Sequence, residues 1–321
     1  MKGLNSYPFY IESTVKLLRK FFDDLMFHEV ITPVLFKAIP AEPTLYAFST
    51  EWGNEKFYLP TSPEAYLKKV LATGAGNCYS IAHTFRNLEA TGNLHSPEFL
   101  MLEWYRENST YTDIMRDITN LLKFLVEHTP SCKLKLAGDN DIKKIRMSSL
   151  FKEYLGVTSI EDYTDNELKS LAESKNINTE GLPTWEQLFN QLFLNFIEPN
   201  LPTEPFFLVD FPAKISPLCK PSLTNPNIAE RFELYINRIE LANGCTEPTD
   251  YKFLQKVFED EIQYRELNNL PKAPIDYEFV KAVKIAKEKG LNLAGVGMGV
   301  ERVSMLLNGK NSIRDLKVKP S

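Results

Sequence analysis

The chain has 321 residues, 43% of them hydrophobic and 12% aromatic, which is enough to bury a large core and excludes a mostly disordered protein. Its formal net charge of -5 gives no global attraction to nucleic acid or to an anionic membrane, and no run approaches the ~18 apolar residues of a membrane span. Cys78, Cys132, Cys219 and Cys245 lack CxxC spacing and no signal peptide is evident, so we expect a cytoplasmic protein without zinc or disulfides.

The first element is an amphipathic helix over residues 9–26. Apolar side chains recur there at helical spacing, with charged residues between them. The segment EVITPVLF, residues 29–36, then reads as a strand that contains Pro33. Because proline lacks a backbone donor, we expect this strand at a sheet edge or a subunit boundary.

The next segment, KFYLPTSPEAYLKKVL, predicts a strand that leads into a helix. Ser62 is a good N-cap, and Pro63 suits the first helical position. Glu64 then lies in the first turn. A carboxylate there is most often only a partner of the helix dipole, and a functional role needs other residues to converge on it.

Residues 85–106, FRNLEATGNLHSPEFLMLEWYR, predict two strands joined by a polar loop. Since side chains alternate faces along a strand, Phe99, Met101, Glu103 and Tyr105 share one face. An aromatic ring, a carboxylate and a phenol in a row suit a ligand with a flat ring and an amine. Arg86 adds a positive fork of the kind that grips phosphate.

The rest of the chain predicts further helices and strands. A second amphipathic helix covers 112–128, and short helical patterns fill 133–203. Strand character returns at 204–218, and residues 230–244 read as a hairpin that turns near Asn237 and Arg238. A polar helix follows Glu247 and Pro248, and a glycine-rich strand and a helix end the chain at 293–307. This order predicts an α+β fold in which a mainly antiparallel sheet is flanked by helices.

Two features leave more than one interpretation open. The glycines at 295, 297 and 299 have GxGxG spacing, which excludes a dinucleotide fold but permits close approach of a flat ligand, or close helix packing beside Arg302. Glu240 and Glu247 are either magnesium ligands or solvated charges. No Ser/His/Asp or Cys/His grouping indicates covalent catalysis.

These segments resemble the three signature motifs of class II aminoacyl-tRNA synthetases: 9–36, 85–106 and 295–307. Within that class YLPTSPEAYLKK, FRN…HSPEFLMLEWY, FPAKISPL, RFELYINRIELANGCTEPTD and SIRD look like the lysine branch. The first motif begins almost at Met1, so we expect one catalytic domain over 1–321 without an anticodon-binding domain, variable and helical at about 133–203. This layout and NLPKAPIDYEFVKAVK are similar to elongation factor P (R)-β-lysine ligases.

The resemblance implies an ATP- and Mg²⁺-dependent ligase and assigns roles to individual residues. Arg86 and Arg302 would be catalytic, because they neutralise phosphate charge. The ATP-binding residues would be Arg86, Asn87, Glu89, His95, Ser96, Phe99, Glu240, Leu241, Gly299 and Arg302. The amino-acid substrate would contact Ser62, Pro63, Glu64, Glu103, Tyr105, Asn243 and Glu247, and the metal ligands would be Glu240 and Glu247.

The chain departs from the family pattern at a few positions. Leu88 stands where family members have a glutamate that contacts adenine, so we expect Glu89 to take that role. Gly297 and FPAKISPL look more like lysyl-tRNA synthetases than like the ligases, which leaves α- and β-lysine both open. Cys245 and Thr246 replace bulkier residues, so the pocket floor is expected to differ.

The leading hypothesis is a ligase that activates lysine or (R)-β-lysine as the adenylate and attaches it to a lysine side chain of elongation factor P. The alternative is a lysine-activating enzyme that charges tRNA or a small molecule. A non-catalytic, amino-acid-binding regulator is the third hypothesis, although Arg86, Glu240 and Arg302 are all retained. We expect a homodimer through the first motif and neither tRNA nor a membrane as partner.

Overall fold

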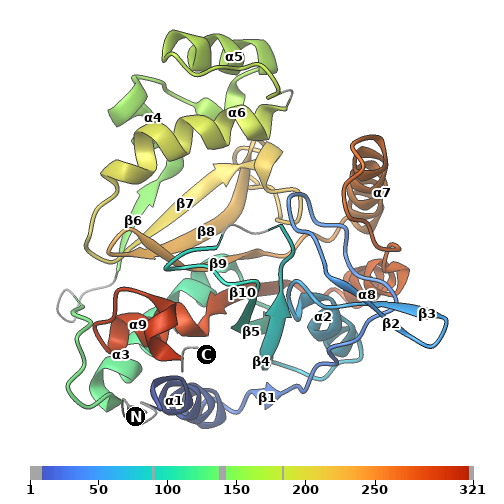
Figure 1. Ribbon diagram of the computed structural model, residues 1–321, viewed down its shortest axis with the longest axis vertical. Helices are drawn as coiled ribbons and strands as arrows, with labels where there is room; N and C mark the ends of the chain where they lie inside the picture. Colours follow the sequence, from blue (N-terminus) through green and yellow to red (C-terminus); the bar gives the residue numbers. More distant parts are fainter. Residues whose placement is uncertain (1–8, 89–90, 137–141, 183, 318–321) are drawn as a thin grey trace, which may run out of the picture. The chain divides into compact units, whose positions relative to one another are not determined.

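The computed structural model describes residues 9–88, 91–136, 142–182 and 184–317 (Figure 1). The chain divides into two compact units: Met1–Lys135 with Thr249–Ser321, and Leu136–Pro248. A single catalytic domain over 1–321 stays a prediction. No helix within the described ranges is long and apolar enough to cross a bilayer.

The first unit is built on three antiparallel strands: β4 (Cys78–Phe85), β5 (Glu98–Glu107) and β10 (Leu293–Gly299). β5 lies in the middle, and β1 (His28–Glu29) pairs in parallel with β4 at the edge. The strand predicted at 29–36 is therefore wrong beyond Glu29. Pro33 lies outside any strand, which agrees with its lack of a ladder donor.

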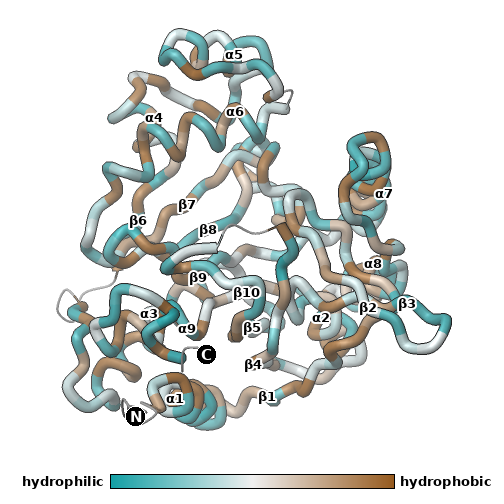
Figure 2. Tube along the Cα trace, viewed as in Figure 1, coloured by the Kyte–Doolittle hydropathy of each residue, from teal (hydrophilic) through white to brown (hydrophobic). Residues whose placement is uncertain are grey.

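Helices α1 (Tyr10–Asp24), α3 (Tyr111–His128) and α9 (Val300–Leu307) pack on one another and on one face of this sheet (Figure 1). Their core includes Phe22, whose ring stacks on Tyr79 and lies 5.3 Å from that of Trp104. Apolar and polar residues alternate along α1 (Figure 2), as its sequence pattern predicted.

The opposite face carries α2 (Glu64–Ala72) and α8 (Tyr277–Glu288), and α7 (Tyr251–Leu267) packs on α8. The helix α2 begins one residue later than predicted, at Glu64. The hydroxyl of Ser62 still accepts a hydrogen bond from the Glu64 amide at 3.3 Å. A two-stranded hairpin precedes α2, formed by β2 (Ser49–Trp52) and β3 (Glu55–Tyr58).

The second unit has its own four strands. β6 (Lys143–Arg146) runs parallel to β7 (Phe206–Pro212), and β7, β8 (Ile228–Ile236) and β9 (Ile239–Thr246) are antiparallel. The hairpin predicted at Asn237 and Arg238 is confirmed: both have positive φ, 53° and 64°, which matches the twist of a two-residue turn. β6 was not predicted.

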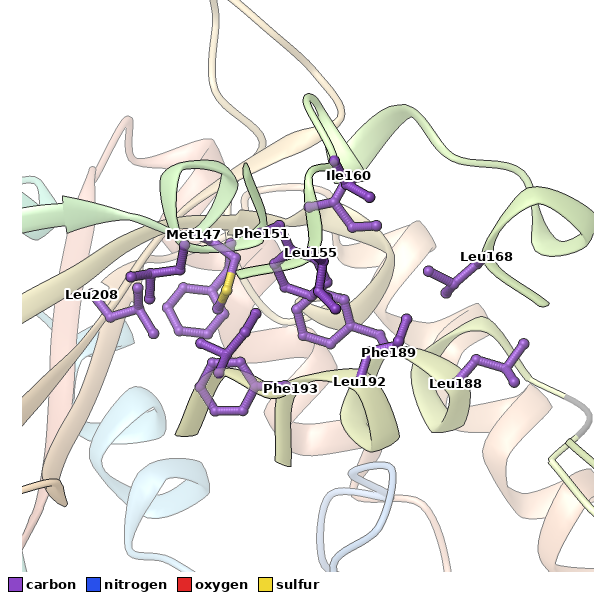
Figure 3. Close-up of a cluster of buried hydrophobic side chains, with 14 of the residues drawn as sticks. Met147, Phe151, Leu155, Ile160, Leu168, Leu188, Phe189, Leu192, Phe193 and Leu208 are labelled. Atoms are coloured by element: carbon purple, nitrogen blue, oxygen red, sulfur yellow. The ribbon is translucent and has the colours of Figure 1, made fainter. Parts of the chain in front are cut away.

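The helices of this unit are α4 (Met147–Leu155), α5 (Asp165–Ser174) and α6 (Trp185–Leu192). They bury a cluster (Figure 3) in which Phe189 stacks on both Phe151 and Trp185. The shorter helical turns of the chain are η1 (Ile160–Asp162), η2 (Phe193–Ile197), η3 (Glu198–Asn200), η4 (Ala213–Ile215) and η5 (Ile313–Leu316). The α+β prediction, with mainly antiparallel strands flanked by helices, is confirmed.

Candidate active site

The middle strand β5 carries the predicted row of side chains, and small residues of the two neighbouring strands lie beside that row. Opposite Glu103 lie Ser80 of β4 and Gly297 of β10. Opposite Tyr105 lie Cys78 and Gly295. Directly opposed residues share a face, so small side chains border Glu103 and Tyr105 on both sides.

Glu103 and Tyr105 form a buried pair. The Tyr105 hydroxyl donates to Glu103 Oε1 at 2.6 Å, and Glu103 is only 4% exposed. Burial, followed by the negative charge of Glu64, raises the pKa of Glu103 well above its ordinary value. A Cβ at Gly295 would lie 2.2 Å from the Tyr105 ring. Glycine at 295 is therefore what lets the ring lie over β10.

The charge of Glu64 acts on Glu103, so Glu64 does more than interact with the dipole of its own helix. Its carboxylate forms an ion pair with Lys68, one turn later on α2, and Lys68 is 5% exposed. The Lys68 ammonium lies 5.7 Å from the Tyr105 ring centroid. Lys68 was not among the predicted site residues, although its i,i+4 spacing from Glu64 is a usable signal.

Glu42 is a further carboxylate that sequence analysis missed. Its Oε1 is buried, and no described residue donates a hydrogen bond to it. Burial and the charge of Glu64 raise the pKa of Glu42 to about 8, although Arg86 and Lys68 oppose this rise. The backbone around it is held by the buried Arg265, whose Nη2 donates to the Glu42 carbonyl at 2.5 Å.

Arg86 lies at the end of β4, beside the aromatic residue of β5. Its guanidinium carbon is 5.3 Å from the Phe99 ring centroid, and its Nε donates to the Thr61 carbonyl at 3.5 Å. The next residue, Asn87, donates its backbone N–H to the Tyr46 carbonyl at 2.7 Å. The Arg86 guanidinium and the Phe99 ring thus lie at one end of the row on β5, and the Glu103 carboxylate lies toward the other end.

Arg302 reaches back from α9 to the polar loop after β4. Its Nε donates to the Leu94 carbonyl at 3.2 Å, and its Nη2 donates to His95 Nε2 at 2.9 Å. Its neighbour Glu301, 3% exposed, accepts the Leu100 N–H at 3.0 Å and thereby ties α9 to β5. Sequence analysis missed this positioning role of Glu301.

Three further residues were predicted to bind the nucleotide at this end: Ser96, Glu89 and Gly299. Ser96 is half-buried in the same loop, and Glu89 lies outside the described residues. A Cβ at Gly299 would stay 3.7 Å from the Arg302 side chain, so atoms of the chain itself do not require glycine there.

The other candidate residues belong to the second unit, on or next to β9. Glu240 is the second residue of this strand, and Glu247 follows its last residue, Thr246. That Glu240 and Glu247 bind one magnesium ion stays a prediction. Glu247 is buried, with its Oε1 3.8 Å from Cys245 Sγ, and the side chain of Leu241 is buried as well.

One carboxylate that interacts electrostatically with Glu240 is Glu233 of β8, which was not predicted as a site residue. Glu233 accepts hydrogen bonds from Arg231 at 2.8 Å, Tyr235 at 2.9 Å and Asn243 at 3.3 Å. Burial and the charge of Glu240 raise the pKa of Glu233 to about 7. The period-two alternation Arg231, Glu233, Tyr235 was the available signal.

Two carboxylates that repel each other fit a divalent cation. Magnesium is usually bound through one or two carboxylates together with substrate phosphates. Within the described ranges no three His, Cys, Asp or Glu side chains gather as a metal-binding group. Glu233 and Glu240 are thus one candidate carboxylate pair in this unit, beside the predicted pair Glu240 and Glu247.

Comparison with known proteins agrees with this arrangement of the residues. The sequence profile of the family "tRNA synthetases class II (D, K and N)" matches residues 9–321. The chain therefore belongs to the class II tRNA synthetases of this group, which confirms the family expected from its motifs.

The similar curated proteins are ligases of two kinds. An "Elongation factor P--(R)-beta-lysine ligase" from Proteus mirabilis is 33% identical over 317 residues, which cover 95% of this chain and 92% of that protein. Its counterpart from Vibrio atlanticus is 32% identical over 94% of this chain and 92% of its own length. A "Lysine--tRNA ligase" from Saccharolobus solfataricus is 31% identical over 94% of this chain, which spans only 62% of that longer protein.

Proposed function

We propose that this protein activates lysine or (R)-β-lysine with ATP, as the aminoacyl-adenylate, and transfers it to a lysine side chain of elongation factor P. The observation that supports this proposal best is the row of side chains on β5. Phe99, beside Arg86, lies at one end of the row, and the buried Glu103–Tyr105 pair lies at the other. The match to nearly the full length of elongation factor P ligases supports the acceptor.

The nucleotide occupies the Phe99 end in this proposal. Arg86 holds the α-phosphate, and Phe99 and Arg302 hold the adenine ring between them. Asn87, His95 and Ser96 complete this end from the loop, and Gly299 contacts the nucleotide through its backbone. Phe99 and Glu103 are four residues apart, so ring and amine are about 13 Å apart, as in an extended adenylate.

The amino acid occupies the carboxylate end. Ser62 and Glu64 receive the amino-acid end of the substrate, with Pro63 between them, while Glu103 and Tyr105 receive the distal ammonium. Buried carboxylates make a buried ammonium tolerable, because its three donors each need an acceptor.

Magnesium would be held by Glu240 together with Glu233. When bound, such an ion neutralises charge on the phosphates of ATP. The two glutamates keep the ion in place from neighbouring strands, and Arg231 and Asn243 orient Glu233 through the hydrogen bonds that they donate.

The reaction needs no protein nucleophile. A carboxylate oxygen of the amino acid attacks the α-phosphorus, the bond to pyrophosphate breaks, and an acyl-adenylate forms. The acceptor amine then attacks the acyl carbon, AMP leaves with the bonding electrons, and the amine loses a proton as the amide forms. The enzyme contributes alignment and charge stabilisation.

We also propose a homodimer through residues 9–36, in the cytoplasm. The segment after α1 exposes large apolar side chains, including Met26 at 85%, Ile31 at 80% and Leu35 at 50%. Exposed large apolar side chains that follow one another in a single segment fit a protein interface.

A second candidate function is charging of tRNA with lysine, which the similarity to lysine–tRNA ligases favours. The two functions share the adenylate and differ only in the acceptor, so the acceptor has to be tested directly.

The test measures activation and transfer separately. Purified protein is assayed for amino-acid-dependent ATP–pyrophosphate exchange with each lysine isomer, and elongation factor P and tRNA are then offered as acceptors. We expect exchange, and a mass increase of the factor by one acyl group. Arg86→Ala should lower exchange by about 100-fold or more, whereas Arg116→Ala, at an exposed position on α3, should leave it unchanged.

Each alternative has its own outcome. Exchange with transfer to tRNA but an unchanged mass of elongation factor P would refute the proposed acceptor. Absence of exchange with every isomer would refute activation and favour a non-catalytic, amino-acid-binding regulator.

A further inference from the structure

In the first unit, acidic side chains outnumber the lysine that lies among them. Glu42, Glu64 and Glu103 act on one another electrostatically, and Lys68 pairs with Glu64. Arg265, which also acts on Glu42, is paired with Glu261 at 2.6 Å. The carboxyl groups therefore outnumber the cation among them, so a further cation from a ligand would favour their ionised forms.

One carboxylate oxygen in this group lacks a donor. Oε1 of Glu42 is buried and accepts no hydrogen bond from a described residue. The neighbouring Glu103, 4% exposed, accepts a hydrogen bond from Tyr105 at Oε1. A buried acceptor without a donor costs free energy, so Oε1 of Glu42 awaits a donor from elsewhere.

The surrounding charges distinguish the two acceptors. Arg86, which the proposed function places on the α-phosphate, is among the charges that act most strongly on Glu42. The charges that act most strongly on Glu103 are those of Glu64, Lys68 and Glu42. Tyr46, four residues after Glu42, accepts the backbone N–H of Asn87, the neighbour of Arg86, at 2.7 Å. Glu42 therefore lies toward the reacting end of the row, and Glu103, which is bonded to Tyr105, lies toward the distal end.

We propose that Glu42 is a specificity residue that accepts the amine next to the substrate carboxyl group, together with Glu64, and thereby selects acids that carry two amines. This inference rests on the proposed function and adds to it the basis of substrate selection. An acid with only the distal amine leaves Glu42 without a donor, and such unpaired buried groups discriminate strongly between ligands.

Because the pKa of Glu42 is raised, its proposed role can be tested by counting the protons that are released when the ligand binds. With a pKa of about 8, the ligand-free carboxyl is mostly protonated at pH 7. An incoming ammonium favours the ionised form, so binding lowers this pKa and releases up to one proton. Glu64, Lys68, Arg86, Arg265 and Glu103 set the starting value.

The matched variants are Glu42→Gln and, as control, Glu51→Gln at an exposed position on β2. The KM of the diamino acid in exchange and the inhibition constant of 6-aminohexanoate, which has only the distal amine, are measured for each. Loss of a charged hydrogen bond should raise the KM in Glu42→Gln by about 10-fold or more, with little change in kcat. The inhibition constant of 6-aminohexanoate should stay at the wild-type value.

Titration calorimetry in phosphate and in Tris buffer at pH 7 then counts the protons released when the diamino acid binds. The wild type and Glu51→Gln should release up to one proton more than Glu42→Gln. An unchanged KM and unchanged proton release in Glu42→Gln, with exchange intact, would refute the role of Glu42 and leave the proposed function standing. Equal weakening of both ligands would also refute it, because the change would then be structural.

Discussion

The glycine opposite Tyr105 offers a direct test of how β5 and β10 support the candidate site. In Gly295→Ala the new Cβ would lie 2.2 Å from Cε1 and 2.3 Å from Cδ1 of the Tyr105 ring. Carbon atoms that are not bonded approach to about 3.5 Å. The ring must therefore move by more than about 1 Å, and the 2.6 Å hydrogen bond to Glu103 cannot survive that shift.

The expected change in the free energy of unfolding of Gly295→Ala has three contributions. Overpacking of a filled site costs about 1–3 kcal/mol, and loss of a hydrogen bond to a charged group costs about 1.5–3 kcal/mol. Alanine in a strand returns about 0.5–1 kcal/mol of conformational entropy. The net loss is about 2–5 kcal/mol, which for a chain of 321 residues corresponds to a melting temperature lower by roughly 3–7 °C.

Thermal unfolding followed by circular dichroism measures this change. Gly297→Ala is the matched control, because its Cβ would meet the flexible Met101 side chain at 3.2 Å and should cost less than about 1 kcal/mol. A Gly295→Ala protein that melts within about 1 °C of the wild type would show that the Tyr105 ring does not depend on this glycine.

Two further predictions concern the acidic residues. Tyr105→Phe removes the donor that stabilises ionised Glu103, so the KM for the amino acid should rise about tenfold while the KM for ATP stays unchanged; exchange kinetics that show an unaltered amino-acid KM would contradict this. Burial raises the pKa of Glu233 from its ordinary 4.5 to about 7, so the folded protein binds more protons than the unfolded chain, and this contribution to the free energy of unfolding is lost as pH rises from about 4.5 to 7. Urea unfolding at pH 5 and pH 8 should show a smaller loss in Glu233→Gln than in the wild type, and an equal loss would refute the assignment.

Local sequence patterns were enough to predict most of the elements that carry the site. The helix expected at 112–128 is α3, Tyr111–His128, because its apolar stripe repeats with the helical period. The shared face of Phe99, Glu103 and Tyr105 follows from the strand period alone. The strand at 29–36 failed because apolar composition outweighed the effect of Pro33 in that prediction.

The sequence by itself determined the family, the alternation along β5 and the identity of the charged residues at both ends of its row. Only the tertiary structure decided which acidic residues share one environment. Glu42 meets Arg265 across 223 residues of chain, and Glu64 comes from a different element than Glu103. The physical reason is that a pKa and an unsatisfied oxygen depend on burial and on neighbouring charges, which arise from contacts between distant segments and leave no periodic trace in the sequence.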